Sequence, residues 1–310
     1  MSTTNGESRY INPYTDFGFK KLFGSELNKD LLISFLNALL GGKQVVEKVS
    51  YKSSEHFGAS KDSRRVIFDV YCENDKGEKF IVEMQNVYQQ FFKDRSVFYS
   101  TFPIQEQGQV GEWDFRLKNV YTVGILNFCF PENEYAPDDY FHEVKLIDTK
   151  DKHVFYDKLT LLYIEMPKFN KREDQLETMF DKWLFVLRNL SRLMERPAAL
   201  QERIFERVFE QAEIARYSET ERREYEESVN AYRDINNAVN TARREGLEEG
   251  IEVGMEKGRK EGIEAGRKEG IETGRKEERL ALAKSMKADG MPLPTIEKYT
   301  NLTAEEISKL

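Results

Sequence analysis

The stretch from residue 64 to residue 85 constrains the fold more than any other part of this sequence. Two β-branched and aromatic runs, residues 64–72 and 79–85, flank a short polar turn. Each run carries one carboxylate that a buried strand normally avoids. Gly77 lies in the turn and supplies the positive φ that a three-residue hairpin loop requires. The sequence therefore predicts a β-hairpin with an acid in each strand.

The register of this hairpin follows from its turn. If Asn74 pairs with Glu78, then Asp69 lies directly opposite Glu83, and Gln85 shares their face by the two-residue period of a strand. Two facing carboxylates repel each other and destabilise the sheet unless a cation lies between them. The alternative is a pair of solvent-facing acids on the open side of an antiparallel sheet.

We interpret the pair as a metal site. Mg²⁺, with Mn²⁺ or Ca²⁺ as alternatives, would take one oxygen from each of Asp69 and Glu83 and the backbone carbonyl of Met84. Such a cation promotes in-line attack of water on a phosphodiester and neutralises charge on the phosphoryl oxygens. The pattern thus points to hydrolytic nuclease chemistry, with Asp69, Glu83 and Gln85 as candidate catalytic residues.

Four residues outside the hairpin are further candidates. Asp16 begins an apolar-periodic helix, where a helix N-cap is its simplest role and a metal ligand is the alternative. Lys20 follows one turn later and would approach phosphate. Arg95 and Tyr99 are four residues apart on the helix expected after the hairpin, so both can face the same site. Arg95 would contact the scissile phosphate or, alternatively, pair with a neighbouring acid.

Composition and charge narrow the class of protein. The chain has 310 residues, of which 12% are aromatic, enough for one sizeable core and a smaller appendage. Its net charge of −8 argues against non-specific nucleic-acid binding over the whole surface, although residues 43–65 are locally basic.

Cys72 and Cys129 are too few for a disulfide framework or a thiolate cluster, and the three histidines show no helical pairing typical of zinc hydrolases. With a polar N-terminus and no apolar stretch long enough for a bilayer, we expect a cytoplasmic protein without membrane contact.

The pattern along the chain predicts four segments. They are an α/β core at residues 1–170, a helical extension at 171–240, a glycine-repeat helix or partly disordered linker at 241–279, and a small helical tail at 280–310. In the core, helices are expected at residues 16–24, 28–40 and 86–108, and strands at 45–55, 120–130 and 161–166 besides the hairpin. Helices that precede and separate strands favour a mixed sheet. The tail is similar to a helix-turn-helix unit or, alternatively, is a helical cap or oligomerisation element.

Glycine recurs at every fourth position from Gly246 to Gly274. Glutamate and lysine between the glycines are spaced for i,i+4 ion pairs, which contribute roughly 0.2–0.5 kcal/mol each. Each interior glycine costs about 1 kcal/mol relative to alanine, so eight glycines outweigh the pairs. We therefore expect partial disorder or a partner packed on the glycine row, such as a second copy of the chain.

The order of these parts resembles the PD-(D/E)XK nuclease superfamily and, within it, the recombination-promoting nuclease and transposase family of bacteria. The resemblance covers nearly the whole chain, including the glycine repeat and the helical tail. The matching segments are residues 15–23, 34–40, 68–70, 82–85 and 165–169, together with Arg95 and Tyr99.

The resemblance implies a central mixed sheet flanked by helices and metal-dependent cleavage of DNA. By position, Asp69 corresponds to the family's metal-binding aspartate, and Glu83 to the acid of the (D/E)-x-K element. Asp16 would correspond to the acidic residue of the first helix that completes the metal site. Gln85 stands where lysine is usual, and a neutral amide orients water and stabilises charge more weakly. The resembled subfamily commonly carries glutamine at this place.

Two functions of different classes follow. The first is a Mg²⁺-dependent DNA endonuclease of transposase type, linked to recombination or mobile-element DNA breakage. The alternative is a DNA-binding or scaffolding protein with a weakened or inactive nuclease site, oligomerised through the glycine-repeat helix. Asp69 and Glu83 favour the enzyme, whereas Gln85 and the acidic net charge favour the scaffold.

Overall fold

The computed structural model describes residues 8–56, 66–131 and 136–310. The chain divides into two compact units, Met1–Val239 and Asn240–Leu310. The first unit contains the sheet and the candidate site, and the second contains most of a long helix and the C-terminal tail. Each unit is described by itself.

A six-stranded mixed sheet is the centre of the first unit. Its strands lie in the order β1 (Val49–Tyr51), β4 (Val70–Asn74), β5 (Lys79–Gln85), β6 (Val120–Leu126), β8 (Val154–Glu165) and β7 (Phe141–Ile147). Strands β5, β6 and β8 are parallel, and the remaining neighbours are antiparallel. The predicted mixed α/β class is confirmed. The first strand is shorter than expected, and β7 is not expected from the sequence because Glu143 and Lys145 interrupt its apolar pattern.

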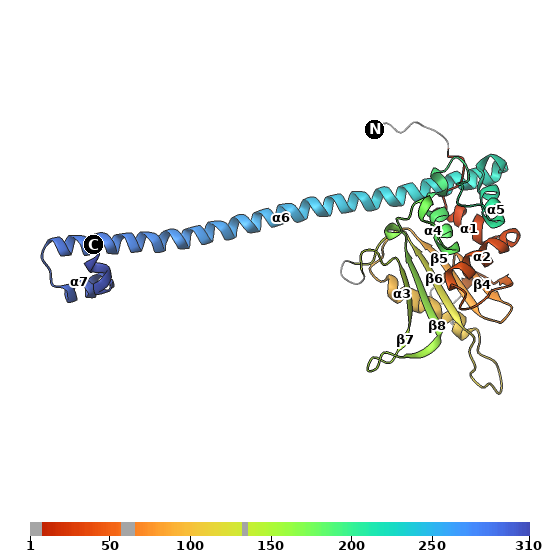
Figure 1. The fold of residues 1–310 in the computed structure, drawn as a ribbon, viewed down its shortest axis with the longest axis horizontal. Coiled ribbons are helices and arrows are strands. Elements are labelled where there is room, and N and C mark those ends of the chain that lie inside the picture. The colour runs from red at the N-terminus through yellow and green to blue at the C-terminus, as the bar shows by residue number, and fades with distance from the viewer. Residues whose placement is uncertain (1–7, 57–65, 132–135) are drawn as a thin grey trace. The chain divides into compact units, whose positions relative to one another are not determined.

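Helices flank both faces of this sheet. They are α1 (Asp16–Phe23), α2 (Lys29–Leu40), α3 (Phe92–Gln105), α4 (Met179–Asn189) and α5 (Arg203–Ala212), joined by 3₁₀ turns η1 (Glu26–Asn28), η2 (Met166–Lys168), η3 (Glu173–Gln175), η4 (Leu190–Arg192) and η5 (Ile214–Arg216). Helix α3 lies on one face, and the other four lie on the opposite face (Figure 1). The predicted end of α2 is confirmed, since Gly41 adopts φ +58° there.

Alternate side chains of β5 pack in two different hydrophobic clusters, one on each face of the sheet. Phe80, Val82 and Met84 belong to the main core, with helices α1, α2, α4 and α5. Ile81 packs in a separate cluster with residues of α3. Because successive side chains point to opposite faces, Glu83 lies on the α3 face. The sheet therefore places this acid beneath one helix and away from the main core.

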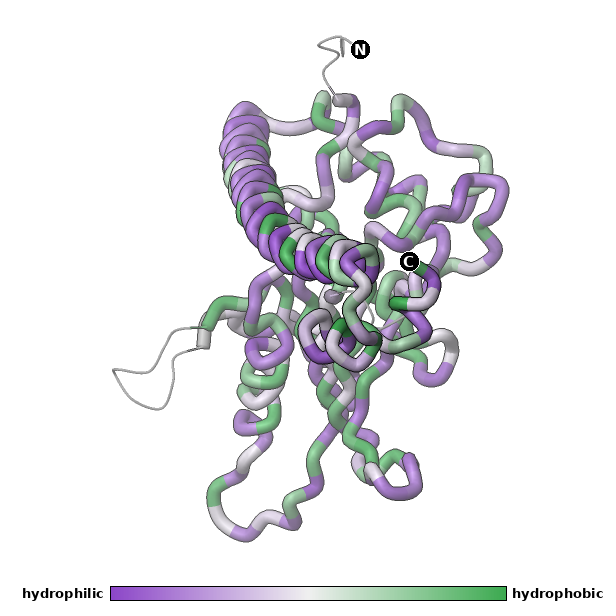
Figure 2. Tube along the Cα trace, turned by 90° about the vertical axis from the view of Figure 1, so that its left-hand side faces the viewer, coloured by the Kyte–Doolittle hydropathy of each residue, from purple (hydrophilic) through white to green (hydrophobic). Residues whose placement is uncertain are grey.

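Helix α6 (Glu219–Ala288) runs without interruption through the glycine repeat, in line with the helical alternative expected for this segment. It is hydrophilic along most of its length, with recurring apolar residues (Figure 2). A Cβ added at any glycine from Gly246 to Gly274 would meet nothing within 4 Å. The predicted ion pairs are present at Glu256–Lys260 (2.7 Å) and Glu264–Lys268 (3.0 Å).

Two short helices, α7 (Leu293–Thr300) and α8 (Ala304–Ser308), pack on the end of α6 through Ala283, Met286 and Ile296. The predicted capping box at Thr303 and Glu306 is confirmed. None of the helices within the described ranges combines the length and apolar character needed to cross a membrane.

A buried ionic cluster joins the ends of β7 and β8. The Glu165 side chain is fully buried, and its carboxylate contacts His142 Nε2 at 2.6 Å and Lys168 Nζ at 2.9 Å. It also accepts the backbone N–H of Phe130 at 2.8 Å. Burial alone raises the pKa of Glu165, but these hydrogen bonds outweigh it and hold the pKa below its ordinary value.

We expect Glu165→Ala to destabilise the first unit by about 3–5 kcal/mol, because it removes the buried carboxylate to which Lys168, His142 and the Phe130 N–H are hydrogen-bonded. Urea unfolding followed by tryptophan fluorescence measures this loss. Glu112→Ala, at an exposed position, is the matched control and should change stability by less than about 0.5 kcal/mol. Equal unfolding midpoints for the two variants would contradict the assigned role of Glu165.

Candidate active site

The hairpin has the predicted register and turn. Val70 pairs with Val82, Gly77 adopts φ +79°, and Asn74 N donates to Glu78 O at 2.9 Å. The antiparallel ladder ends at the Val70–Val82 pair.

Asp69 lies at a bend rather than in the strand, which corrects the expectation of a directly opposed pair in a continuous ladder. The first arm is also divided, because the short strand β3 (Val66–Ile67) pairs with β2 (Glu55–His56) in a separate sheet. Residues 64 and 65 of the expected arm lie outside the described ranges.

The bend brings the two acids together through backbone hydrogen bonds. Asp69 N donates to Glu83 Oε1 at 3.1 Å, and Met84 N donates to Asp69 Oδ2 at 2.9 Å. Each carboxylate thereby keeps lone pairs that could face a cation. The side chain of Asp69 reaches the β5 backbone because the chain bends here, one residue before β4 begins to pair with β5 at Val70.

The surroundings of the two acids disfavour their charged forms. Burial, and after it the neighbouring Asp69 carboxylate, raise the pKa of Glu83 to about 8, against the lowering effects of the Asp69 N–H and Arg95. Burial likewise raises the pKa of Asp69, although its hydrogen bond from Met84 N–H lowers it. Two buried carboxylates whose charged forms are disfavoured are the donors expected where a divalent cation binds.

The Met84 carbonyl faces the same side as Asp69. Within a strand, the N–H and C=O of one residue point toward the same neighbour, and Met84 N points to the Asp69 carboxylate. The ladder donors that would normally occupy this carbonyl are directed elsewhere, since Phe68 N donates to Ser54 O and Asp69 N to Glu83. The set of two carboxylates and one carbonyl therefore fits Mg²⁺.

Gln85 lies at the end of β5, on the same face as Glu83. Its Nε2 is 3.4 Å from Glu83 Oε2, at the long limit of a hydrogen bond. The amide thus contacts the carboxylate from the position where a lysine would place a charge.

Helix α1 places one acid and one base near Asp69. Asp16 raises the pKa of Asp69 and Lys20 lowers it, and the two α1 side chains form an exposed ion pair at 2.8 Å. The expected N-cap role of Asp16 is wrong: Thr15 is the N-cap, and its hydroxyl accepts Gly18 N–H at 3.0 Å. Asp16 occupies the first turn, where its carboxylate pairs with Lys20.

Helix α3 covers the site from the other side. Arg95 and Tyr99 line a small cavity together with Glu83, as their four-residue spacing predicted. The Arg95 guanidinium lies 5.4 Å from the Tyr99 ring centre and donates to Gln89 Oε1 at 2.7 Å, rather than forming the alternative surface ion pair. It lowers the pKa of both acids of the hairpin.

Three residues of this cavity are not indicated by the sequence. Gly124 pairs with Glu83 across β5 and β6, and a Cβ there would lie 3.1 Å from the Tyr163 ring. Its small size lets α3 approach the sheet. Ser96 and Thr122 also line the cavity, and Thr122 Oγ1 is buried with no hydrogen-bond partner among the described residues. Of these three residues, only Gly124 could have been noticed in the sequence, because an isolated glycine in a strand indicates that another element approaches the backbone closely.

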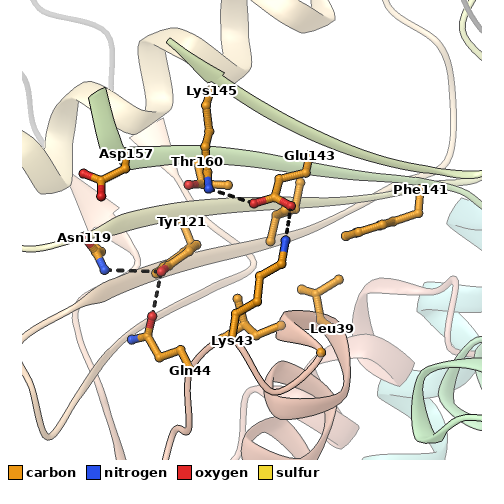
Figure 3. A pocket seen from close by; sticks show the side chains of 13 residues that line it. Leu39, Lys43, Gln44, Asn119, Tyr121, Phe141, Glu143, Lys145, Asp157 and Thr160 are labelled. Carbon is orange, nitrogen blue, oxygen red and sulfur yellow. Dashed lines mark hydrogen bonds and ion pairs between the residues drawn. The ribbon is translucent and has the colours of Figure 1, made fainter. Parts of the chain in front are cut away.

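A larger cavity of about 290 Å³ lies on the opposite face of the sheet, beside α2 (Figure 3). Lys43 and Lys145 both reach Glu143, and the Tyr121 hydroxyl donates to Gln44 Oε1 at 2.7 Å. This cavity is separate from the acid pair. Lys43 is one of the basic residues in the segment 43–65, and its charge is compensated here by Glu143.

Two other groups lie apart from the acid pair. Lys52 of the basic segment pairs with Glu73 at 3.2 Å, and residues 57–65 lie outside the described ranges. Asp148, Asp151 and His153 come close together in the turn between β7 and β8, where they are mostly exposed.

The six-stranded mixed sheet and its flanking helices are consistent with a PD-(D/E)XK fold. The chain belongs to the PD-(D/E)XK nuclease family transposases, whose family model matches residues 13–242. Neither the curated proteins nor the solved structures compared with the chain gave a match. The matched range includes the whole sheet, helices α1 to α5 and the start of α6.

Proposed function

We propose that this protein is a Mg²⁺-dependent DNA endonuclease that breaks DNA in recombination or in the movement of mobile elements. The observation that carries the proposal is the partly buried Asp69–Glu83 pair, joined by reciprocal backbone hydrogen bonds at the end of the β4–β5 ladder. Membership of a nuclease family supports DNA as the substrate. The acid pair, with the Met84 carbonyl and Asp16 as further ligands, would hold the cation.

The residues around the pair have separable roles in this proposal. A bound divalent cation supplies positive charge to the scissile phosphate and acidifies the attacking water. The Gln85 amide would orient that water by hydrogen bonding. Arg95 would hold a phosphate oxygen through its guanidinium, with Tyr99 stacked beneath it, and Lys20 would contact the DNA backbone from α1.

The direct test is nicking of supercoiled plasmid by the full chain with Mg²⁺, Mn²⁺ or Ca²⁺. We expect metal-dependent nicking that is abolished by EDTA and by Glu83→Ala. Circular dichroism of the variant establishes that it is folded. If folded wild-type protein nicks no faster than this variant with all three metals, the endonuclease proposal is wrong.

Arg95→Ala is expected to lower the cleavage rate by about 10²–10³-fold, because one preorganised charge that stabilises the transition state is lost. Arg95→Lys should recover only part of the rate, since an ammonium cannot reproduce bidentate contact with phosphate. Single-turnover cleavage of a labelled duplex measures both. Wild-type rates in Arg95→Ala would show that this residue has no part in the reaction.

The second candidate is a DNA-binding scaffold with a weakened nuclease site, assembled through α6. The neutral Gln85 and the row of open glycines on α6 favour it. Light scattering of the full chain gives the oligomeric state. If α6 has no partner, Gly258→Ala should stabilise the helix by about 1 kcal/mol, and the helix content measured by circular dichroism should rise. If the row is a contact between copies, the same change should reduce the mass instead.

A further inference from the structure

An exposed phenylalanine stands at the edge of the candidate active site. Phe91 follows the end of β5 by six residues, immediately before α3, and its side chain is 66% exposed. Single exposed apolar residues are common on protein surfaces and need no explanation by themselves. Its place one helical turn before Arg95, which lines a cavity with Glu83, gives it significance.

Phe91 directly precedes the α3 residues that line the site with Glu83, which are Phe92, Arg95, Ser96 and Tyr99. Phe91, Arg95 and Tyr99 are spaced four residues apart, and Arg95 N donates to Phe91 O at 3.0 Å, so the helical spacing begins at Phe91. Arg95 and Tyr99 share a cavity with Glu83. The Phe91 backbone therefore lies about one helical turn, roughly 5.4 Å along the axis, before Arg95.

The backbone that carries this ring is held by an aromatic cluster. The adjacent Phe92 is buried and packs on Phe128 and Tyr163, with ring centres 5.6 Å away in each case. Tyr88, in the same loop, meets the edge of Phe128 at 5.4 Å. Packing of this kind fixes the start of α3, so that Phe91 projects from a firm support rather than from a loose loop.

We propose that Phe91 stacks on an unpaired base next to the scissile phosphate, and that the substrate class is DNA with unpaired nucleotides at the cleavage site. This inference rests on the proposed endonuclease function. Stacking of a base on an aromatic side chain contributes about 1–3 kcal/mol and does not depend on sequence. In an intact duplex the bases are stacked on one another, and exposing one costs a few kcal/mol. Arg95 at the adjacent turn would hold the phosphate of the same nucleotide.

The test compares three labelled DNA substrates of one length: a duplex, a duplex with a central unpaired bubble, and a single strand. With Mg²⁺, wild-type protein should cut at unpaired nucleotides about 5–150-fold faster than in the duplex, the range that 1–3 kcal/mol gives. Phe91→Ala should lower the rate on the bubble and reduce this ratio, and Phe91→Trp should preserve it. Phe155→Ala is the matched control, because Phe155 on β8 is 75% exposed and outside the site.

Equal cleavage of all three substrates by wild-type protein, or an equal loss on all three in Phe91→Ala, would overturn the proposal and leave the endonuclease function standing. If no substrate is cut, the endonuclease function fails, and binding decides the role of Phe91. Fluorescence anisotropy with Ca²⁺ should then show tighter binding of the single strand than of the duplex, lost in Phe91→Ala. A change of oligomeric mass in Phe91→Ala without a change in binding would assign the ring to a protein contact instead.

Discussion

Asp69→Asn is expected to reduce metal-dependent DNA cleavage on the order of 10²–10⁴-fold. Asparagine still accepts the Met84 N–H, so the bend is kept, but it removes the charge that would bind the cation. A metal ion in such a site contributes several kcal/mol to transition-state stabilisation, and each 1.4 kcal/mol is tenfold in rate. Plasmid nicking with Mg²⁺ and Mn²⁺, together with calorimetric titration of the metal, measures both consequences.

Asp75→Asn is the matched control for this prediction. Asp75 lies in the turn of the same hairpin, and its exposed side chain points to solvent beyond the paired strands. Its replacement should leave both cleavage and metal binding unchanged. Equal cleavage by Asp69→Asn and Asp75→Asn would mean that the hairpin is not the active site.

Glu83→Gln is expected to make the metal-free protein more stable at alkaline pH. The pKa of Glu83 is raised from 4.5 in the unfolded chain to about 8 in the folded chain. Between these values the folded state binds more protons than the unfolded state, so wild-type stability falls as pH rises through this window. The loss is on the order of a few kcal/mol at pH 9 and absent at pH 4, and glutamine, which stays neutral, avoids it.

Thermal unfolding in EDTA at pH 5, 7 and 9 checks this prediction. The advantage of Glu83→Gln should grow with pH, and Mg²⁺ should raise the melting temperature of wild-type protein more than that of the variant. Glu78→Gln serves as a control in the same strand region, since Glu78 is also mostly buried but hydrogen-bonded to Asn74 and Asn119. A pH-independent difference between Glu83→Gln and wild type would rule out the titration of Glu83 as its cause.

Local sequence was sufficient for the hairpin and several helix ends. The turn at Gly77 fixed which residues of β4 and β5 pair, because a hairpin loop of given length allows one register. Gly41 and the Thr303 capping box ended and began helices where expected, since these signals act within one helical turn. The same local reasoning failed at Asp16, where the adjacent Thr15 took the capping position.

Elements that depend on neighbours distant in sequence were less predictable. Strand β7 has charged residues along its length and is held in the sheet by β8, so no apolar run identified it. The bend at Asp69 arises because β3 pairs with β2 and leaves the main sheet. In the glycine repeat, low helix propensity predicts partial disorder or a partner on the glycine row, and the continuous α6 with its open row of glycines agrees with the second alternative.

The sequence by itself determined the turn, the register and the presence of one acid on each side of the hairpin, because these follow from interactions between residues close in the chain. Only the tertiary structure decided that Asp69 leaves the ladder and that α1 and α3 bring Asp16, Lys20 and Arg95 to it. Helices α1 and α3 are separated by some seventy residues in the sequence. Each packs on one face of the sheet, and this packing brings residues of both helices to the same site. Hydrophobic packing against the sheet, which is non-directional and acts over the whole chain, set those positions.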